Sequence, residues 1–439
     1  MKKSIISGAS IIALAVAAPA IAQQAQSSDV DQVGDDNTAT VSQQGNEGLS
    51  DIDQDGNDNL AEVTQTEDPT GANLFNVAAN KATIDQTGDN SRARIEQHSD
   101  NPGSNPGNEA TITQNSEAPG GNTVPSGFSL NGRIIQSGSA NISTITQNGN
   151  PNNPGGPGDD GSGSGVTARN DQTGSGNSSS ITQNVFGDTA DPYSDADVIQ
   201  NGTNNDSTVQ QRGSDARVLV TQSNDGNFSD VSQGANKEME ATVTQSGNRN
   251  ISYVDQIART VTASVTQSGD DNESYVTQGG QSRESDAIVS QGADNSFSDV
   301  DQTNTASLAI VTQISGTNLR STINQSDGEG AEANVTQSGD TLTSTVMQTG
   351  DGQLANVDQS GFNNLSDISQ ENGAGSGDNF ASVIQSGENN MSYIVQSGTE
   401  NSATVMQGND GNLSNVDQTG TGNSATVMQN VASAPATSM

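Results

Sequence analysis

One short segment has the residue types and spacing of a calcium-binding loop. Asp51, Asp53 and Asp55 alternate along the chain, Gly56 follows them, and Glu62 occupies the twelfth place. This order of oxygen ligands around a glycine turn is the pattern of an EF-hand loop, which binds Ca²⁺ between two helices. Both flanks of the segment alternate as strands do. We therefore expect no EF-hand, and weak peripheral binding of divalent cations by rows of acidic residues is the milder alternative.

The chain has few of the residues that usually carry out catalysis. His98 is the only histidine and falls in an inserted stretch, His98-Ser99-Asp100-Asn101-Pro102, so we expect a solvated loop residue there. The absence of cysteine removes disulfides and thiolate metal sites. Carboxylate pairs are frequent, but their polar surroundings do not predict the burial that acid–base catalysis needs. We expect no enzyme activity, no metal site and no cofactor.

The overall composition is that of a disordered chain unless a regular pattern overrides it. Of the 439 residues only 28% are hydrophobic and 3% aromatic, and the net charge is -39. A conventional apolar core is not expected from these numbers. The negative charge repels nucleic acid and anionic membrane surfaces, so we expect neither nucleic-acid binding nor membrane insertion.

A regular pattern is present from Ser28 to Gln429. A five-residue unit recurs there: Ala or Ser, any residue, Val or Ile, any residue, and Gln. We count 32 units, and most of the glutamines that end them are eleven residues apart. Alternation with period two predicts a strand with Ala or Ser, Val or Ile, and Gln on one face. The Gly-, Asn- and Asp-rich residues between the units predict turns.

Strands and turns at a fixed short period are typical of a solenoid, in which each unit buries its face only against its neighbours. Two units make one rung of about 22 residues, and the chain has about 16 rungs. We predict an all-β, cross-β or amyloid-like β-solenoid of stacked strand-turn-strand rungs. Ladders of Ala, Ser, Val and Ile would fill its interior, flanked by Gln and Asn that bond to their copies in adjacent rungs.

The chain has four predicted segments. Residues 1–22 read as a secretory signal peptide, because Lys2 and Lys3 precede an apolar stretch that ends in Ala20-Ile21-Ala22. Residues 23–200 form an irregular repeat region with Gly-, Pro- and Asn-rich inserts, of which the one between Gln147 and Gln172 is expected to bulge from a turn. Residues 201–429 form a regular array, and residues 430–439 a short tail.

The repeats resemble those of the curlin family. From Gln418 the chain reads Q-T-G-T-G-N-S-A-T-V-M-Q, which is similar to the curlin pattern S-x5-Q-x-G-x-G-N-x-A-x-x-x-Q from its first glutamine onward. The residues that carry the resemblance are Ser50, Ile52, Gln54, Gly56, Asn59, Ala61 and Gln65; Gln172, Gly174, Gly176, Asn177 and Gln183; and Ser414, Val416, Gln418, Gly420, Gly422, Asn423, Ala425 and Gln429. Together with Val63, Gln385, Gln396, Gln407 and Val427, they are the expected ladder and turn positions.

The resemblance implies a biological setting. Curlins are exported unfolded through an outer-membrane pore of Gram-negative bacteria, and with a nucleator subunit they polymerise at the cell surface into curli. These are amyloid fibres, comparable to pili or fimbriae, that support cell adhesion and biofilm. By this resemblance the chain is a secreted fibre subunit.

The ends of the repeat array favour polymerisation independently. Repeats begin about five residues after the predicted cleavage and stop about ten before Met439, so little chain is left to cover the terminal strands. We expect head-to-tail stacking of the chain on itself. Acidic outward positions oppose it, so acid pH or divalent cations are expected to accelerate assembly.

The alternative is a monomeric β-solenoid that binds a surface, such as an ice-binding protein or a calcium-dependent adhesin. Such a protein would need a uniform outward row. The outward residues Thr40, Asp51, Glu62, Thr83 and Arg94 vary, which favours the fibre.

Overall fold

The computed structural model of the chain describes eleven stretches of residues: 26–45, 48–67, 79–99, 107–116, 129–150, 165–186, 194–213, 215–234, 238–280, 283–372 and 377–430. These stretches contain 32 strands and no helix. The predicted signal peptide, most of the insert between Gln147 and Gln172, and the tail beyond Asn430 lie outside the described residues.

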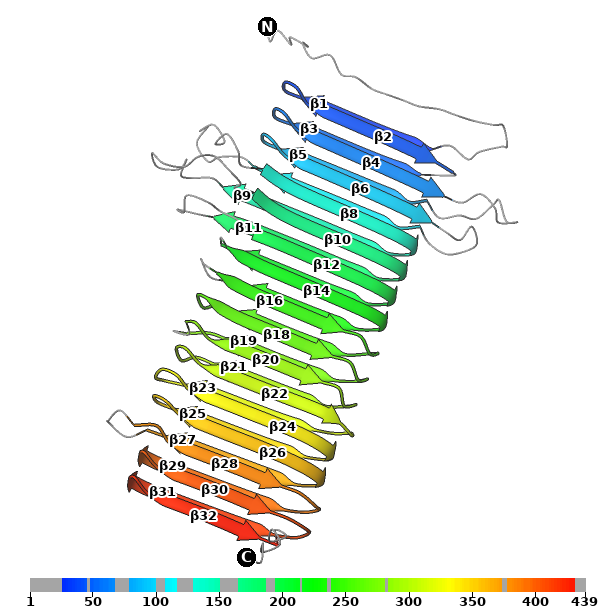
Figure 1. Cartoon of the computed structure of the whole chain (residues 1–439). Helices are drawn as coiled ribbons and strands as arrows, with labels where there is room; N and C mark the ends of the chain where they lie inside the picture. The colour runs from blue at the N-terminus through cyan, green and yellow to red at the C-terminus, as the bar shows by residue number, and fades with distance from the viewer. Residues whose placement is uncertain are drawn as a thin grey trace, which may run out of the picture. The chain divides into compact units, whose positions relative to one another are not determined.

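The chain divides into two compact units, which we describe separately. The first comprises Met1–Gly226 and Asp230–Glu238, and the second comprises Asn227–Ser229 and Met239–Met439. Strand β15 (Phe228–Gln233) contains residues of both. Each unit is built from two sheets, one of odd-numbered and one of even-numbered strands. Figure 1 shows the strands of each unit following one another in chain order.

The first unit contains fourteen complete strands in its described residues. Those of the odd sheet are β1 (Ser27–Val33), β3 (Leu49–Asp55), β5 (Lys81–Thr87), β7 (Glu109–Asn115), β9 (Ile142–Asn150), β11 (Ser178–Phe186) and β13 (Asp206–Arg212). Those of the even sheet are β2 (Thr38–Gln44), β4 (Leu60–Glu67), β6 (Arg92–Ser99), β8 (Ser129–Ser139), β10 (Gly165–Ser175), β12 (Ser194–Thr203) and β14 (Ala216–Asp225).

The second unit repeats the arrangement. Its complete odd strands are β17 (Ile251–Gln256), β19 (Glu273–Gln278), β21 (Phe297–Gln302), β23 (Arg320–Ser326), β25 (Thr343–Thr349), β27 (Leu365–Glu371), β29 (Met391–Thr399) and β31 (Leu413–Thr421). Its even strands are β16 (Met239–Gln245), β18 (Val261–Gln267), β20 (Asp286–Gln291), β22 (Leu308–Ser315), β24 (Glu332–Asp340), β26 (Leu354–Phe362), β28 (Phe380–Gln385), β30 (Ser402–Gln407) and β32 (Ser424–Gln429).

Pairing within each sheet is parallel and places equivalent residues of successive rungs beside one another. Ser402 of β30 pairs with Ser424 of β32, and Gln407 pairs with Gln429. Consecutive strands in the chain lie in opposite sheets, so one odd and one even strand make a rung. The register shifts at one place in the described second unit, between β22 and β24. The predicted all-β solenoid of strand-turn-strand rungs is confirmed.

Burial alternates along the strands as the five-residue unit predicts. In β3 and β5 the side chains of Ile52, Gln54, Ile84 and Gln86 are all 0% exposed, and the residues between them are exposed or half-buried. A β-strand directs successive side chains to opposite faces, so every second residue reaches the interior. The core is therefore a narrow layer between two sheets, consistent with the low hydrophobic content of the chain.

Glycine is needed where the turns of successive rungs approach most closely. Gly56 has a φ of 133°, in the region that favours glycine. A Cβ atom on Gly56 would lie 1.9 Å from the carbonyl oxygen of Gly88 in the next rung. Gly88 has a φ of 98°, so the same conformation recurs from rung to rung.

The expectation that His98 lies in a loop is wrong. His98 is an exposed residue of β6, where it pairs with Thr66 of β4 and Ser137 of β8. The neighbouring strands are long enough to offer backbone partners at this position, so the sheet continues past the repeated five-residue unit to Ser99.

Candidate assembly site

Within each unit, the interior glutamines of successive rungs form hydrogen-bonded ladders. The Nε2 group of Gln54 donates to Oε1 of Gln86 in the next rung at 2.8 Å, and also to the carbonyl of Thr38 in the other sheet at 3.3 Å. A glutamine amide carries two N–H donors, and both are used. Each glutamine therefore joins successive rungs of one sheet and also joins the two sheets.

The same geometry holds at the far end of the second unit. Gln396 donates to Oε1 of Gln418 at 2.8 Å and to the carbonyl of Phe380 at 2.9 Å. Within the part of the chain that the structure describes, these glutamine-to-glutamine bonds run from one glutamine to the next along the ladder, as from Gln54 to Gln86 and from Gln396 to Gln418. The ladder thus has a polarity: it starts with a carbonyl oxygen and ends with an N–H group.

A second ladder of asparagines lines the turns. The backbone N–H of Asn401 donates to Oδ1 of Asn379 at 3.0 Å, and its side chain donates to the carbonyl of Gly420 at 3.0 Å. Each of these asparagine side chains thus satisfies a backbone carbonyl and a backbone N–H of the following rung. The predicted copy-to-copy bonds occur as well, for example between Asn423 Nδ2 and Asn401 Oδ1 at 2.9 Å.

The structure places the residues expected to form ladders and turns in three environments. Side chains in the closed interior are Ser50, Ile52, Gln54, Asn59, Ala61, Val63, Gln65, Gln172, Asn177, Gln183, Gln385, Gln396, Gln407, Ser414, Val416 and Gln418. Glycines with positive φ, at the ends of strands or in the turns, are Gly56, Gly174, Gly176, Gly420 and Gly422. Partly or fully exposed residues of the last rung are Asn423, Ala425, Val427 and Gln429.

The terminal strands show the interior pattern without the interior burial. In β2 and β32 the inward side chains are half-buried, whereas in β30 they are buried. Among the described residues, β1 and β2 pair with a strand on one side only, as do β31 and β32. These four strands present unsatisfied backbone edges of the kind that accept a further strand.

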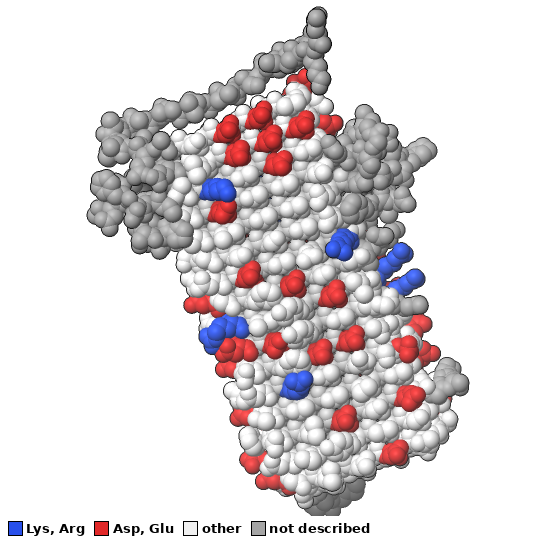
Figure 2. Space-filling view, turned by 180° about the vertical axis from the view of Figure 1, so that it is seen from behind, with Lys and Arg blue, Asp and Glu red and all other residues white. Residues whose placement is uncertain are grey.

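The residues that resemble a calcium loop do not come together. Asp51, Asp53 and Asp55 lie on the outer face of β3, and Glu62 lies in β4 of the other sheet. Partial desolvation, reinforced by neighbouring carboxylates of which Asp85 contributes most, raises the pKa of Asp53 above its usual value. Figure 2 shows acidic side chains gathered over the first rungs of this face. No group of three or more ligand side chains in the described residues is arranged to hold a metal ion.

Sequence reasoning missed a polar bridge across the core. Asn170 occupies the Val or Ile position of β10 and is 0% exposed. It donates from Nδ2 to the hydroxyl of Ser143 at 2.6 Å and accepts at Oδ1 from the hydroxyl of Ser179 at 2.8 Å. The departure of Asn170 from the repeat pattern was the available signal.

A cluster of aromatic residues was also missed. The rings of Phe228, Tyr253, Tyr275 and Phe297 follow one another at centroid distances of 5.4, 4.9 and 5.9 Å, and the guanidinium of Arg320 lies 4.2 Å from the Phe297 centroid. A hydrogen bond from the Tyr275 hydroxyl to Glu273, assisted by desolvation, raises the pKa of Tyr275 to about 12. Rings stacked in this way stabilise adjacent rungs.

Parallel, in-register rungs with glutamine and asparagine ladders define a β-solenoid of the cross-β type. A family model described as the curlin associated repeat matches residues 25–66, 194–223, 328–361 and 378–408. Four segments of the chain therefore carry curlin associated repeats, which supports its assignment to the curlin family. None of the curated proteins compared matches the chain. No helix among the described residues is long and apolar enough to cross a bilayer.

Proposed function

We propose that the chain is a secreted structural subunit that adds head to tail to copies of itself and forms an extracellular, amyloid-like fibre of the curli type. The proposal is carried by one observation: the outermost rungs have the ladder residues of the inner rungs. Inward positions of the last rung are Ser414, Val416, Gln418, Ala425, Val427 and Gln429, and those of the first are Ser28, Val30, Gln32, Ala39, Val41 and Gln43.

Backbone geometry supports addition at these ends. The carbonyls of Asn423 and Gln429 accept hydrogen bonds from Ser402 and Gly408 of the preceding rung. Backbone groups alternate in direction along a strand, so the N–H and C=O of Thr426 face away from that rung, toward the open edge. In the existing register, an added chain would pair its β2 with β32 and its β1 with β31.

Side-chain polarity supports the same orientation. Gln32 and Gln43 donate to Gln54 and Gln65 of the second rung, which leaves their Oε1 atoms facing the first edge. Gln429 donates to the carbonyl of Leu413 and retains an N–H for a following rung. Head-to-tail addition joins this donor to the acceptor of the next copy, whereas head-to-head addition would oppose two acceptors.

The remaining parts of the proposal rest on the curlin associated repeats. An extracellular fibre would serve in cell adhesion and in the biofilm matrix, and its export and initiation would use a curli-type outer-membrane pore and a nucleator subunit. The function is structural rather than enzymatic. The described residues offer ladders and edges, and their carboxylates lie mainly on the outer faces of the sheets.

The decisive experiment uses one edge substitution and one matched control. Thr426→Pro removes an N–H that faces the open edge without removing a bond to β30, whereas Thr426→Ala removes the same side chain and keeps the N–H. Each mature chain is diluted from denaturant and followed by thioflavin T fluorescence, sedimentation and electron microscopy. We expect fibres after a lag from the wild type and Thr426→Ala, and a reduction in the elongation rate of about tenfold or more with Thr426→Pro.

Circular dichroism of soluble Thr426→Pro distinguishes a blocked edge from a failure to fold. A stable, soluble wild-type monomer with β circular dichroism would contradict the proposal and support the monomeric surface-binding alternative. Elongation of Thr426→Pro at the wild-type rate would show that β32 is not the growing edge.

A further inference from the structure

Two of the four tyrosines of the chain, Tyr253 and Tyr275, are stacked on the outer face of the odd sheet in the second unit. Tyr253 of β17 pairs in register with Tyr275 of β19. Their rings are nearly parallel, with an interplanar angle of 7°, and the ring centroids are 4.9 Å apart. Both side chains are half-buried, so part of each ring is accessible to solvent. Two oxidisable phenols are therefore held side by side within one chain.

The flanking aromatic residues enclose this pair along the stack. The ring of Phe228 lies 5.4 Å from that of Tyr253, in a tilted arrangement. On the other side the ring of Phe297 lies 5.9 Å from that of Tyr275 and is also tilted. The parallel pairing of β17 with β19 fixes the two backbones about 4.8 Å apart. The two phenols therefore remain neighbours for as long as the two strands stay paired.

The hydroxyl group of Tyr275 has a proton acceptor. It donates to Oε1 of Glu273 at 2.5 Å. This hydrogen bond, assisted by desolvation, raises the pKa of Tyr275 to about 12, so the side chain is a neutral phenol at neutral pH. Removal of an electron from a neutral phenol releases the hydroxyl proton, and a hydrogen-bonded carboxylate is positioned to accept it. Glu273 therefore lowers the barrier to one-electron oxidation of Tyr275.

We infer that Tyr253 and Tyr275 form an oxidative coupling site, at which two equivalents of a one-electron oxidant join the two side chains as dityrosine. Each phenol loses one electron and one proton, which gives two phenoxyl radicals. A carbon–carbon bond then forms between ring carbons ortho to the two oxygens, and each of these carbons gives up its proton as its oxygen regains one. The net change is the loss of two protons and two electrons, and the oxidant takes the electrons. Radicals held in one stack couple faster than radicals that must meet by diffusion.

The crosslink staples two adjacent rungs. Strands β17 and β19 are otherwise joined by backbone pairing and by the bond from Gln256 to Gln278 at 2.9 Å. A covalent bond between them closes a loop of one rung in the unfolded chain, and the lost entropy of that loop favours the folded state. This gives a chain without cysteine a covalent link that disulfides cannot supply. Both tyrosines belong to one chain, so the inference does not depend on fibre formation.

The test uses a chain in which Tyr253 and Tyr275 are the two tyrosines that remain. The background variant is the mature chain with Tyr193→Phe and Tyr393→Phe. Tyr253→Phe or Tyr275→Phe is then added, and each keeps an aromatic ring in the stack while removing one phenol. Circular dichroism establishes that each variant is folded. Each is prepared with the natural and with the heavy nitrogen isotope, mixed in equal amounts before folding, and illuminated briefly with tris(bipyridyl)ruthenium and persulfate, which generate a one-electron oxidant.

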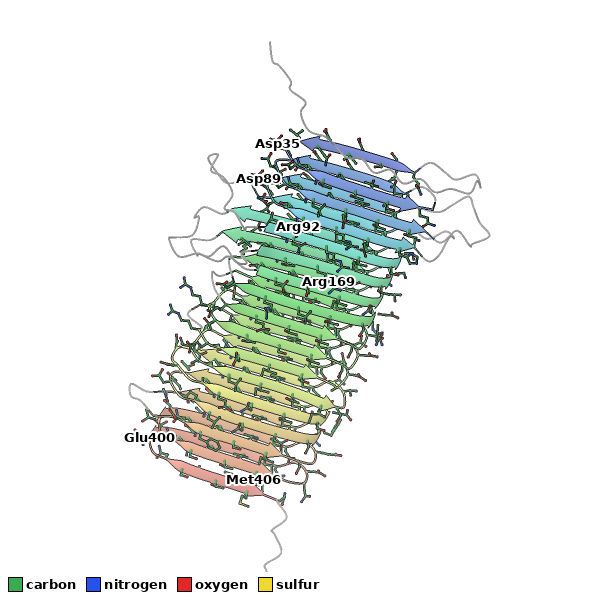
Figure 3. All side chains as sticks on the ribbon, turned by 45° about the horizontal axis from the view of Figure 1, so that its top comes forward. Asp35, Asp89, Arg92, Arg169, Glu400 and Met406 are labelled. Atoms are coloured by element: carbon green, nitrogen blue, oxygen red, sulfur yellow. The ribbon has the colours of Figure 1, made fainter. Side chains whose placement is uncertain are left out.

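Tryptic digestion in denaturant separates the two tyrosines, because trypsin cleaves after Arg249, Arg259 and Arg283. Mass spectrometry then detects the two tyrosine peptides joined, with two hydrogen atoms lost. A crosslink within one chain joins peptides of the same isotope, whereas crosslinks between chains also join different isotopes. Methionine oxidation, for example at Met406 on the outer face of β30 (Figure 3), adds oxygen instead and is distinguished by its mass.

We expect same-isotope crosslinks in the folded background variant and none between the two peptides in either phenylalanine variant. Oxidation in denaturant should give a yield about tenfold lower, because the rings are no longer held together. Glu273→Gln should slow the coupling by about fivefold or more, whereas Glu240→Gln, at an exposed position of β16, should not. The crosslinked chain should unfold at a higher denaturant concentration than the oxidised Tyr275→Phe variant.

Three results would overturn the inference: no crosslink in the folded background variant, equal yields from the folded and the denatured chain, or isotope mixing as frequent as random pairing predicts. Thioflavin T growth curves of the unoxidised chains report the proposed function independently, because the coupling takes place within one chain.

Discussion

The odd and even sheets have the same glutamine ladder but differ in the small residue at the start of each five-residue unit. In the odd sheet this residue is mostly serine, and in the even sheet it is mostly alanine. Both are buried, yet the serine hydroxyls largely lack hydrogen-bond partners among the described residues. The serines concerned are Ser50, Ser207, Ser229, Ser252, Ser274, Ser298, Ser321, Ser344, Ser366, Ser392 and Ser414.

The bridge at Asn170 shows what this difference provides. Asn170 belongs to the even sheet and bonds to serines of the two odd strands that flank β10 in the chain. An asparagine at the same position of an odd strand would face alanines of the even strands, whose methyl groups cannot form hydrogen bonds. The buried serines of the odd sheet can therefore accept or donate a hydrogen bond to a polar residue of the even sheet. The alanines of the even sheet offer no such partner to a polar residue of the odd sheet.

The largest expected effect on stability comes from placing a buried asparagine in each of the two sheets. Val265 of β18 occupies the position of Asn170, and the flanking odd strands carry Ser252 and Ser274. Val276 of β19 occupies the same position in the odd sheet, where the flanking even strands carry Ala263 and Ala287. We expect Val276→Asn to lower the free energy of unfolding by about 4 kcal/mol, because it buries an amide without partners. Val265→Asn should cost about 2 kcal/mol less, because two hydroxyls can bond to it.

The measurement is denaturant unfolding of each variant in the Thr426→Pro background, which limits assembly. The isosteric controls Val265→Thr and Val276→Thr report the loss of apolar surface with a smaller polar group. Equal destabilisation by the two asparagine substitutions would show that the serine sheet does not accept a polar partner.

A smaller effect is expected from exchanging the small residues themselves. Ser274→Ala removes a buried hydroxyl that has no partner, so we expect the free energy of unfolding to rise by about 1 kcal/mol. Ala263→Ser adds such a group to the even sheet and should lower it by about 1 kcal/mol. Thermal and denaturant unfolding measure both, and Ser179→Ala is the matched control, because its hydroxyl bonds to Asn170. A loss of stability in Ser274→Ala comparable to that in Ser179→Ala would mean that Ser274 has a partner after all.

Much of this architecture could be predicted from the sequence, because the same alternation of inward and outward residues recurs in 32 units. Alternation in a unit such as Ser50-Asp51-Ile52-Asp53-Gln54 indicates which side chains are inside, and an eleven-residue spacing indicates stacking. Contacts between outward residues that are far apart in the chain are harder to predict from the sequence. Arg94, Arg133 and Arg169 become neighbours only when inserts of unequal length are removed, and His98 joins β6 because of the lengths of the adjacent strands. The direction of the glutamine bonds depends on side-chain geometry that composition does not specify.

The smallest expected effect is the pH dependence of stability, which depends on carboxyl groups on the outer faces of the two sheets. Burial raises the pKa of Asp299, Asp301 and Asp367 on odd strands, and of Asp197 on an even strand. A carboxyl whose pKa is higher in the folded state binds its proton more tightly there than in the unfolded chain. Stability therefore rises as pH falls through the folded pKa, and the gain is complete below the unfolded value near 3.8. We expect the denaturation midpoint to increase between pH 7 and pH 4.

Asp301→Asn should raise the midpoint at pH 7 by less than Ser274→Ala does, and it should weaken the pH dependence, because the amide carries no charge at any pH. Asp417→Asn, at an exposed position of β31, is the control. A midpoint that falls steadily on acidification in both the wild type and Asp301→Asn would show that these outer carboxylates do not oppose the fold.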